Sequence, residues 1–325
     1  MLKQYAETAT AVGSTCTLVI VSNLTDEEAH DFLRQLWHHV FSFERRFSRF
    51  LPGSELSRFN RSAGTKQFIS PQFKELLTAA RELSSETGGL YNPFIAPALQ
   101  RAGYTKSMVS GHENDEHDDY SARAVVPSDQ LQIAEDTALI PYNTALDLGG
   151  CGKGYLADQL ATMARQQVAG FWFSLGGDIV AGGTDTRGEQ WDIGIERAGD
   201  ESARAGHVKP PGTEPFAVAT SGVFARQGVH NGQRWHHLID SRTLQPAVTD
   251  IASATVCDYS ALRADVFASC AVILGSGSAP AFLRQRTVEA ALLQLIDDRN
   301  GDGQDSGSVR AGSIFTVDEK DIITI

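Results

Sequence analysis

The stretch TALDLGGCGKGYLADQL, residues 144–160, decides the fold of this chain. It predicts the end of a strand at Ala145, Leu146 and Leu148, a turn with glycines at positions 149, 150, 152 and 154, and then a helix. Glycines let a backbone approach a ligand closely, and a helix start offers N–H groups and a positive dipole end to an anion. Asp147 stands where a Walker motif needs glycine, and the G-x-G-x-x-G spacing is absent. From the residues alone, an anion site and a tight packing turn are equally good interpretations.

Composition limits what can surround this turn. The chain has 325 residues, of which 42% are hydrophobic and 21% charged, so it can build one elaborate domain or two smaller ones. The formal net charge of -12, without clustered cations, argues against a nucleic-acid partner. Four scattered cysteines indicate buried thiols in a reducing compartment. The N-terminus lacks an apolar signal core and no run could span a membrane, so we expect a cytoplasmic protein without a membrane anchor.

On the N-terminal side of the turn, the chain predicts strands and helices with loops between them. Residues 12–21 indicate a strand interrupted at the glycine, and Thr25 opens a long amphipathic helix with a capping box. Residues 47–60 indicate a polar loop, and Ser70 caps a second helix. The segment 107–121 is acidic and has no apolar period, which predicts a solvated or disordered insertion.

On the C-terminal side, apolar runs predict strands at 170–177 and 251–257, with a Gly/Pro-rich loop at 199–215. Asn231-Gly232 indicates a tight hairpin turn whose return strand carries residues 235–240. A helix is expected over 262–274.

Asp265 and Ser269 stand at positions i and i+4 of this last helix, one above the other. A carboxylate in an apolar helix is costly to bury alone and needs a metal ion or a basic side chain as partner. From the residues alone, a salt bridge is the favoured interpretation.

Seven segments, taken in order, resemble the FAD:protein FMN transferases of the ApbE family. The segments are VGSTCTLVIV, FSRFLPGSELSRFN, GGLYNPFIAP, ALDLGGCGKGYLAD, SLGGDI with ATSG, HHLIDSRTLQP and ADVFAS. Each is weak alone, and together they span nearly the whole chain.

The resemblance implies an α+β fold of mixed β-sheets with packed helices. It implies one compact unit over residues 1–325 with a ligand cleft between its lobes. The expected reaction is Mg²⁺-dependent transfer of FMN from FAD to a threonine hydroxyl of an acceptor protein, with release of AMP. FAD and that acceptor protein are the expected partners.

The resemblance also implies roles for particular residues. His237 and Asp240 correspond to the family's histidine and aspartate before its R-T-G segment, and His237 is the candidate base. The implied ligands of Mg²⁺ are Asp265, Ser269 and the carbonyl of Gly152. The implied flavin-nucleotide site consists of Gly13, Ser14, Asn60, Asp147, Gly149, Gly150, Lys153, Asp178, Ser221 and Gly222.

The chain departs from the family pattern at four positions. Asn92 and Phe94 replace Asp and Thr, Ser241 replaces Pro, and Leu244 replaces Gly. These changes keep two alternatives open. One is an FAD pyrophosphatase that uses the same metal with water as nucleophile, and the other is a non-catalytic FAD-binding paralogue.

Overall fold

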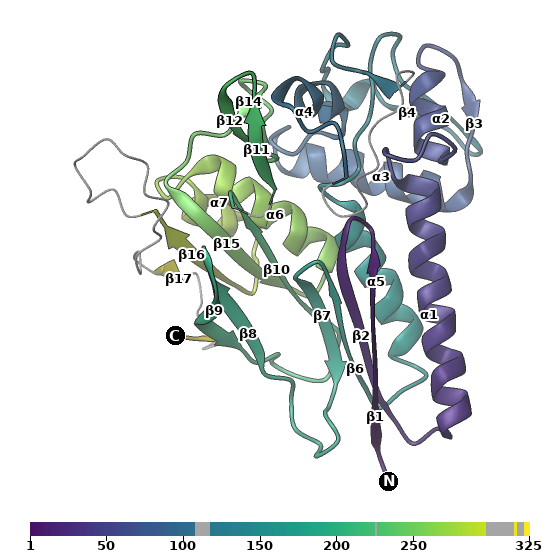
Figure 1. Ribbon diagram of the computed structural model, residues 1–325, viewed down its shortest axis with the longest axis vertical. Coiled ribbons are helices and arrows are strands. Elements are labelled where there is room, and N and C mark those ends of the chain that lie inside the picture. Colours follow the sequence, from purple (N-terminus) through teal and green to yellow (C-terminus); the bar gives the residue numbers. More distant parts are fainter. Residues whose placement is uncertain (108–117, 225, 297–314, 317–321) are drawn as a thin grey trace.

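The computed structural model describes residues 1–107, 118–224, 226–296, 315–316 and 322–325. Its centre is an eight-stranded sheet with the order β1-β2-β6-β7-β10-β15-β16-β17, in which every neighbouring pair is antiparallel (Figure 1). The bounds of these strands are Lys3–Ala11 (β1), Ser14–Ser22 (β2), Gly170–Leu175 (β6), Asp178–Gly183 (β7), Phe216–Gly222 (β10), Ile251–Asp258 (β15), Ala290–Leu295 (β16) and Phe315–Thr316 (β17).

The chain begins with a hairpin rather than the single interrupted strand expected over residues 12–21. Strands β1 and β2 pair along their whole length, and Val12 and Gly13 form the turn with φ angles of 46° and 69°. Both angles are positive, as a two-residue hairpin turn of the right twist requires. The interruption seen in the sequence is therefore the turn itself, and it presents Gly13 and Ser14 at the end of the hairpin.

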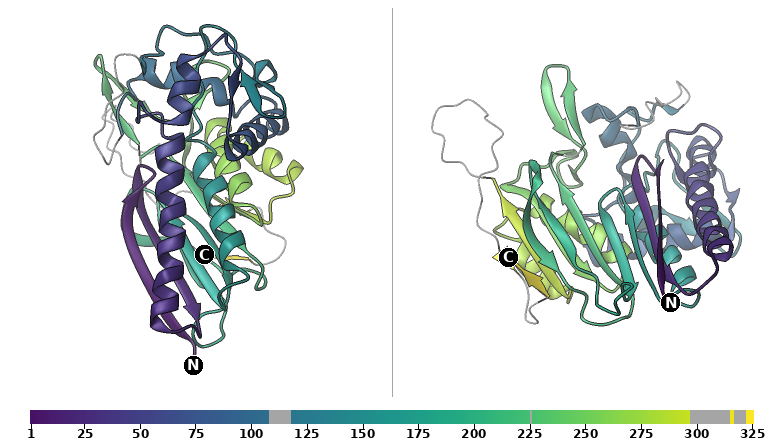
Figure 2. Two further views of the ribbon diagram at one scale, coloured as in Figure 1. Left: turned by 90° about the vertical axis from the view of Figure 1, so that its right-hand side faces the viewer. Right: turned by 60° about the horizontal axis from the view of Figure 1, so that its bottom comes forward.

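One face of the large sheet is covered by three helices: α1 (Asp26–Phe47), α5 (Gly152–Ala164) and α6 (Ala261–Leu274). Helix α1 begins with the predicted capping box, since Thr25 and Glu28 bond to each other's backbone N–H groups. It runs along the β1–β2 hairpin, as the left view of Figure 2 shows. Its Leu33 is fully buried, and such burial typically contributes about 1.5–3 kcal/mol.

The opposite face packs on a small sheet with the order β18-β9-β8. Its strands are β8 (Ile193–Arg197), β9 (Asp200–Val208) and β18 (Ile323–Thr324). The loop predicted over 199–215 is thus wrong for its first half, which is strand β9. The strand escapes notice because only Ala205 and Val208 supply apolar side chains to the core, among polar neighbours.

A second lobe lies beyond one end of the large sheet (Figure 1). It contains α2 (Glu55–Arg61), α3 (Pro71–Glu86), α4 (Ala96–Ala102), the 3₁₀ turns η1 (Pro93–Ile95) and η3 (Ser128–Gln130), and a sheet of β3 (Gln67–Phe68), β5 (Thr137–Leu139) and β4 (Gln132–Ile133).

Two predictions fail in this lobe. The loop expected over 47–60 contains helix α2, which Ser54 caps and which is too short to show an apolar period. The expected insertion over 107–121 is not solvated at its end, because Asp118 and Tyr120 are buried. The Tyr120 hydroxyl donates to Asp118 at 2.6 Å, and Asp118 also pairs with Arg61. Residues 108–117 of the predicted insertion lie outside the described residues.

The predicted hairpin at Asn231-Gly232 is present as β11 (Gln227–His230) and β12 (Gln233–His236). It projects from the body of the molecule, as the right view of Figure 2 shows. Its return strand is shorter than expected, because β12 ends at His236 and the chain then forms a separate pair. That pair consists of β13 (Ile239–Asp240) and β14 (Gln245–Pro246). Helix α7 spans Ala279–Gln285.

The α+β prediction is confirmed, since helices pack on a large sheet and a smaller helical lobe stands at its end. One cluster of buried apolar side chains includes residues from Ala11 to Leu293 and reaches both the large sheet and the second lobe. The assignment of residues 1–325 to a single domain stays a prediction.

Candidate functional site

The glycine turn is held by side chains rather than by a strand ladder. Residues 145–148 belong to no strand, so the predicted strand end is wrong. The buried Asn60 amide donates to Leu146 O at 2.9 Å and its Oδ1 accepts from Leu146 N at 2.8 Å. Asn60 therefore does for this backbone what a neighbouring strand would do.

The four glycines of the turn have different reasons to be glycine. A Cβ on Gly154 would lie 2.5 Å from Ala261 O, so this residue lets α5 pack closely on α6. At Gly149 a Cβ would lie 2.9 Å from Asp147 Oδ1, which accepts the Gly149 N–H. At Gly150 and Gly152 the nearest atoms are 3.4 Å or more away, so these two positions are open to the cavity. Gly154 thus fits the interpretation as a tight packing turn, whereas Gly150 and Gly152 fit the interpretation as a ligand site.

We predict that Gly154→Ala destabilises the protein whereas Gly150→Ala does not. The added methyl at 154 would push α5 from α6, and such overpacking typically costs about 1–3 kcal/mol. The methyl at 150 would meet only the Tyr91 ring at ordinary contact distance. Urea unfolding of both variants measures the difference. Equal stabilities would show that the close approach of the two helices can relax.

The amide groups at the start of α5 are partly used inside the protein. Gly152 N donates to Leu148 O at 2.7 Å, and Gly154 N donates to Asp265 Oδ2 at 3.3 Å. An anion at this turn therefore gains less from free helix amides than the sequence suggests, and more depends on the side chains around it.

Two buried ion pairs fix the turn on its two sides. Arg49 Nε lies 2.6 Å from Asp147 Oδ2, and Lys153 pairs with Asp178. All four side chains are buried or nearly so. Breaking such a pair leaves one buried charge alone, which typically costs about 3–5 kcal/mol. The pairs thus hold the glycine turn in one conformation.

Asp265 is the exception among these carboxylates. It is 4% exposed, and burial raises its pKa, against the opposing effects of Lys153, the Gly154 N–H and Arg226. No Lys or Arg in the described part of the chain forms an ion pair with it, because Lys153 is engaged by Asp178. Ser269, one turn further along α6, lies 2.8 Å from the Ser221 hydroxyl. The salt bridge favoured by the residues alone is therefore absent at this position.

These groups face a cavity of about 930 Å³, which we call the cleft. It lies between the large sheet with its helices and the second lobe. Its size is typical of a pocket for a large small-molecule ligand. The predicted site residues that line it are Gly13, Ser14, Asp147, Gly149, Gly150, Gly152, Lys153, Ser221, Gly222, His237, Asp265 and Ser269.

Three predicted residues are placed behind the cleft lining. The side-chain amide of Asn60 forms its hydrogen bonds with the Leu146 backbone. Asp178 holds Lys153 and accepts the Thr220 N–H at 3.1 Å. Asp240 is held by Arg242, whose hydrogen bonds lower the pKa of that carboxyl. These side chains support the site from behind rather than reach into the cavity.

His237 and His236 occupy opposite sides of the hairpin base. His237 lines the cleft, whereas His236 Nε2 lies 3.0 Å from Ala247 O, away from it. Burial, followed by the nearby Arg226 charge, lowers the pKa of His237 from 6.5 to about 3. The His237 imidazole is therefore neutral near pH 7 and has the form needed to accept a proton.

This low pKa predicts that acid destabilises the ligand-free protein through His237. Its folded pKa lies below the unfolded value, so the unfolded state binds the extra proton once the pH falls below 6.5. The free energy of unfolding should therefore fall by about 2 kcal/mol between pH 6.5 and 5 from this group alone. Denaturation of wild type and His237→Gln at both pH values measures it. Identical acid sensitivity of the two proteins would exclude the effect.

Several side chains of the cleft were not predicted from the sequence. Arg49, Tyr91 and Arg226 line it, together with Phe50 and Tyr104, whose rings lie 4.1 Å and 4.7 Å from the Arg49 guanidinium carbon. Arg49 lies within the quoted FSRF segment, but only the fold brings it to Asp147. The cleft also contains a thiol, Cys270, whose pKa burial raises to about 12, so it stays protonated and is no nucleophile.

At the four positions that depart from the family pattern, each residue fits its local surroundings. Asn92 caps η1 by accepting from Phe94 N at 3.0 Å, and Phe94 is fully buried in the core. Ser241 donates to Gly89 O at 2.7 Å. Leu244 keeps a positive φ of 59°, the left-handed conformation that favours glycine. Only Asn92 among them lines the cleft.

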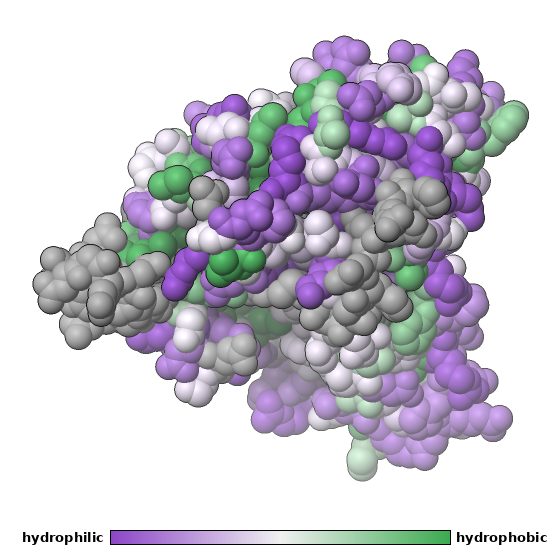
Figure 3. All heavy atoms as spheres, turned by 45° about the horizontal axis from the view of Figure 1, so that its top comes forward, coloured by the Kyte–Doolittle hydropathy of each residue, from purple (hydrophilic) through white to green (hydrophobic). Residues whose placement is uncertain are grey.

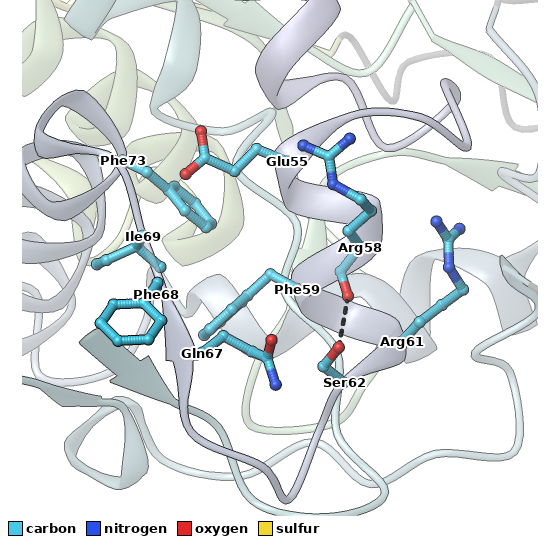
Figure 4. A pocket seen from close by; sticks show the side chains of 9 residues that line it. All are labelled: Glu55, Arg58, Phe59, Arg61, Ser62, Gln67, Phe68, Ile69 and Phe73. Atoms are coloured by element: carbon cyan, nitrogen blue, oxygen red, sulfur yellow. Dashed lines mark hydrogen bonds between the residues drawn. The ribbon is translucent and has the colours of Figure 1, made fainter. Parts of the chain in front are cut away.

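A second cavity of about 390 Å³ lies on the other side of α2 (Figure 4). Aromatic and aliphatic side chains form one wall, and Glu55, Arg58 and Arg61 approach it from α2. These charged groups already bind the protein: Glu55 pairs with Arg46, Arg58 donates to Gly53 O, and Arg61 pairs with Asp118. We therefore assign the chemistry to the cleft.

Figure 3 shows hydrophilic residues over much of one face, with hydrophobic residues in small separate groups. Within the described ranges, no helix combines the length and the apolar character needed to cross a membrane. Nor do three or more His, Cys, Asp or Glu side chains in those ranges gather as a metal cluster. A metal at Asp265 would thus depend on hydroxyl, carbonyl and ligand oxygens for its other contacts.

Comparison with known proteins agrees with the resemblance seen in the sequence. The chain is 29% identical over 295 residues to an FAD:protein FMN transferase of Klebsiella pneumoniae, covering 87% of this chain and 86% of the relative. It is 26% identical over 255 residues to one of Vibrio cholerae, covering 77% and 75%.

Solved structures agree as well. The apo flavinyl transferase ApbE of Pseudomonas stutzeri matches with a TM-score of 0.76 and 25% identity, over 91% of this chain and 92% of that one. The ApbE protein of Thermotoga maritima has the same fold, with a TM-score of 0.77 at 19% identity, over 90% and 94%. Residues 12–292 match the ApbE family, and the chain belongs to it.

Proposed function

We propose that this protein transfers FMN from FAD to a threonine hydroxyl of an acceptor protein, with Mg²⁺ bound at Asp265. That the chain is a flavin transferase follows from its family and from the names of its relatives. The magnesium ion, the threonine and the individual residue roles are the new parts of the proposal.

The observation that carries the proposal is the unpaired Asp265. Lys153 is held by Asp178 and Arg49 by Asp147, while Asp265 is buried without a basic partner among the described residues. A buried carboxylate outside any ion pair is costly, and a bound cation lowers that cost. Asp265 therefore has the environment of a metal ligand.

The oxygen donors around Asp265 suit Mg²⁺. The Ser269 hydroxyl and Gly152 line the same cleft, and hard oxygen ligands with few carboxylates are typical of magnesium sites that also use substrate phosphates. When bound, Mg²⁺ neutralises charge that develops on the pyrophosphate as it is cleaved. Ser221 orients the Ser269 hydroxyl by a 2.8 Å hydrogen bond.

The chain's own residues supply the remaining steps. Gly150 and Gly152 leave room for the pyrophosphate to approach the turn. The threonine oxygen forms a bond to the FMN phosphorus while the bond to AMP breaks, and AMP leaves with the electron pair. His237, neutral and in the cleft, accepts the threonine proton. The anionic pyrophosphate beside it raises the affinity of the imidazole for that proton.

One incubation distinguishes this function from its alternatives. The protein is mixed with FAD, Mg²⁺ and an acceptor protein that bears a flavinylation threonine, and the products are analysed by mass spectrometry. Acceptor carrying FMN supports transfer. Free FMN together with AMP would indicate FAD pyrophosphatase activity. Unchanged bound FAD would indicate a protein that binds FAD without cleaving it.

We also propose a cytoplasmic location. All four cysteines are buried and none forms a disulfide, which suits a reducing compartment.

A further inference from the structure

Arg226 occupies the base of the β11–β12 hairpin and lines the cleft. Its backbone carbonyl accepts the His237 N–H at 3.0 Å, so the two residues are neighbours across that base. Its guanidinium donates to Ser14 Oγ at 3.3 Å, on the turn of the β1–β2 hairpin. Arg226 thus connects two separate walls of the cleft.

Among the described residues, no carboxylate forms an ion pair with Arg226. Lys153 and Arg49, which also line the cleft, each form an ion pair with an aspartate. Within the described ranges Arg226 forms no ion pair, and the one hydrogen bond of its guanidinium is to the neutral Ser14 hydroxyl. Its positive charge contributes to lowering the pKa of His237 and opposes the rise of the Asp265 pKa. Arg226 lines the same cleft as the candidate base His237 and the candidate metal ligand Asp265.

We propose that Arg226 is a further catalytic residue that binds the phosphoryl group of FMN while the acceptor oxygen attacks it. The inference rests on the proposed function and extends it. A guanidinium presents several donors in a fixed fork that matches phosphate oxygens. Its position beside His237 places it on the side from which the nucleophile enters. It would there donate to the non-bridging oxygens of the attacked phosphorus, which lie between the entering threonine oxygen and the departing AMP.

This placement predicts an effect on rate more than on binding. Charge on the phosphoryl oxygens changes as the transferring group passes through the transition state, and a fixed arginine stabilises that state selectively. The two phosphates of FAD already carry negative charge in the ground state, but the proposed metal ion at Asp265 would also bind them. Losing Arg226 should therefore lower kcat strongly and raise the Kd for FAD only modestly.

The test compares Arg226→Gln and Arg226→Lys with Arg234→Gln. Arg234 is exposed on strand β12 of the same hairpin and does not line the cleft, so it controls for loss of one positive charge. We expect Arg226→Gln to lower kcat about 10²–10³-fold with less than a tenfold change in FAD Kd. Arg226→Lys should recover part of the rate, and Arg234→Gln should behave as wild type. Melting temperatures of all three should stay close to that of wild type.

Rescue gives a second measurement. In Arg226→Ala, added guanidinium at millimolar concentration should raise kcat, whereas it should not raise that of wild type or of Arg234→Gln. An unchanged kcat in Arg226→Gln overturns the proposal, and so does a raised Kd with an unchanged kcat. A large loss of melting temperature without rescue would assign Arg226 a structural role instead. If wild type only hydrolyses FAD, the threonine proposal fails, and the same variants are then compared by the rate of hydrolysis.

Discussion

Asp265→Asn should abolish flavin transfer and leave the ligand-free protein at least as stable as wild type. The asparagine keeps the shape of the side chain and removes the charge that would hold Mg²⁺. Metal ions supply several kcal/mol of transition-state stabilisation in such reactions, so we expect a loss of at least about 10³-fold in kcat/KM. Stability should not fall, because the variant no longer buries a carboxylate that lacks a basic partner among the described residues.

Asp258→Asn is the matched control for this prediction. Asp258 is also a buried aspartate, but it pairs with Arg263 at 3.3 Å and does not line the cleft. Its amide variant should lose stability and keep its activity per folded molecule, the opposite pattern. Initial rates and melting curves of both variants test the contrast. Full activity of Asp265→Asn, or of wild type in excess EDTA, would contradict the proposed metal site.

His237→Ala should lower the rate of transfer about 10²–10⁴-fold while changing FAD affinity little. The imidazole is neutral and in the cleft, so its proposed work is to accept the threonine proton in the transition state. His236→Ala should leave the rate unchanged, because that ring binds Ala247 O away from the cleft. FAD titration, initial rates and melting temperatures of both variants measure the split. A stable His237→Ala protein with full activity would remove this residue from the mechanism.

Some of this site could be predicted because its signals are local. The glycines at 149, 150 and 152 and the i, i+4 pair of Asp265 and Ser269 depend only on residues near in sequence, and the fold brings both groups to one cleft. The capping box at Thr25 and the turn at Asn231-Gly232 are local in the same sense. Such features need no knowledge of which segments meet in the folded chain.

Other parts could not be predicted because they depend on distant contacts. Whether Gly154 serves a ligand or a neighbouring helix is decided by Ala261, which belongs to α6. Whether Asp265 forms an ion pair with Lys153 depends on Asp178, because Asp178, in the large sheet, already pairs with Lys153. Strand β9 is recognisable only by its pairing with β8 and β18, because its own residues are mostly polar. The resemblance to the family indicates which residues belong to its motifs. It does not indicate which of their side chains line the cavity and which lie behind it.

The base and the tip of the β11–β12 hairpin differ in how closely they contact the rest of the molecule. Arg226 and His237 stand at its two base positions, and Trp235 anchors it against the ring of Tyr104, with centroids 5.7 Å apart. Its tip at Asn231-Gly232 is exposed, and at Gly232 an added Cβ would meet no atom within 4 Å. Residues inserted at this exposed tip would therefore leave the two base residues in place, whereas Gly232 itself, with a φ of 77°, favours glycine. The hairpin thus keeps two cleft residues in place at its base, while none of the described residues in its strands and tip lines the cleft.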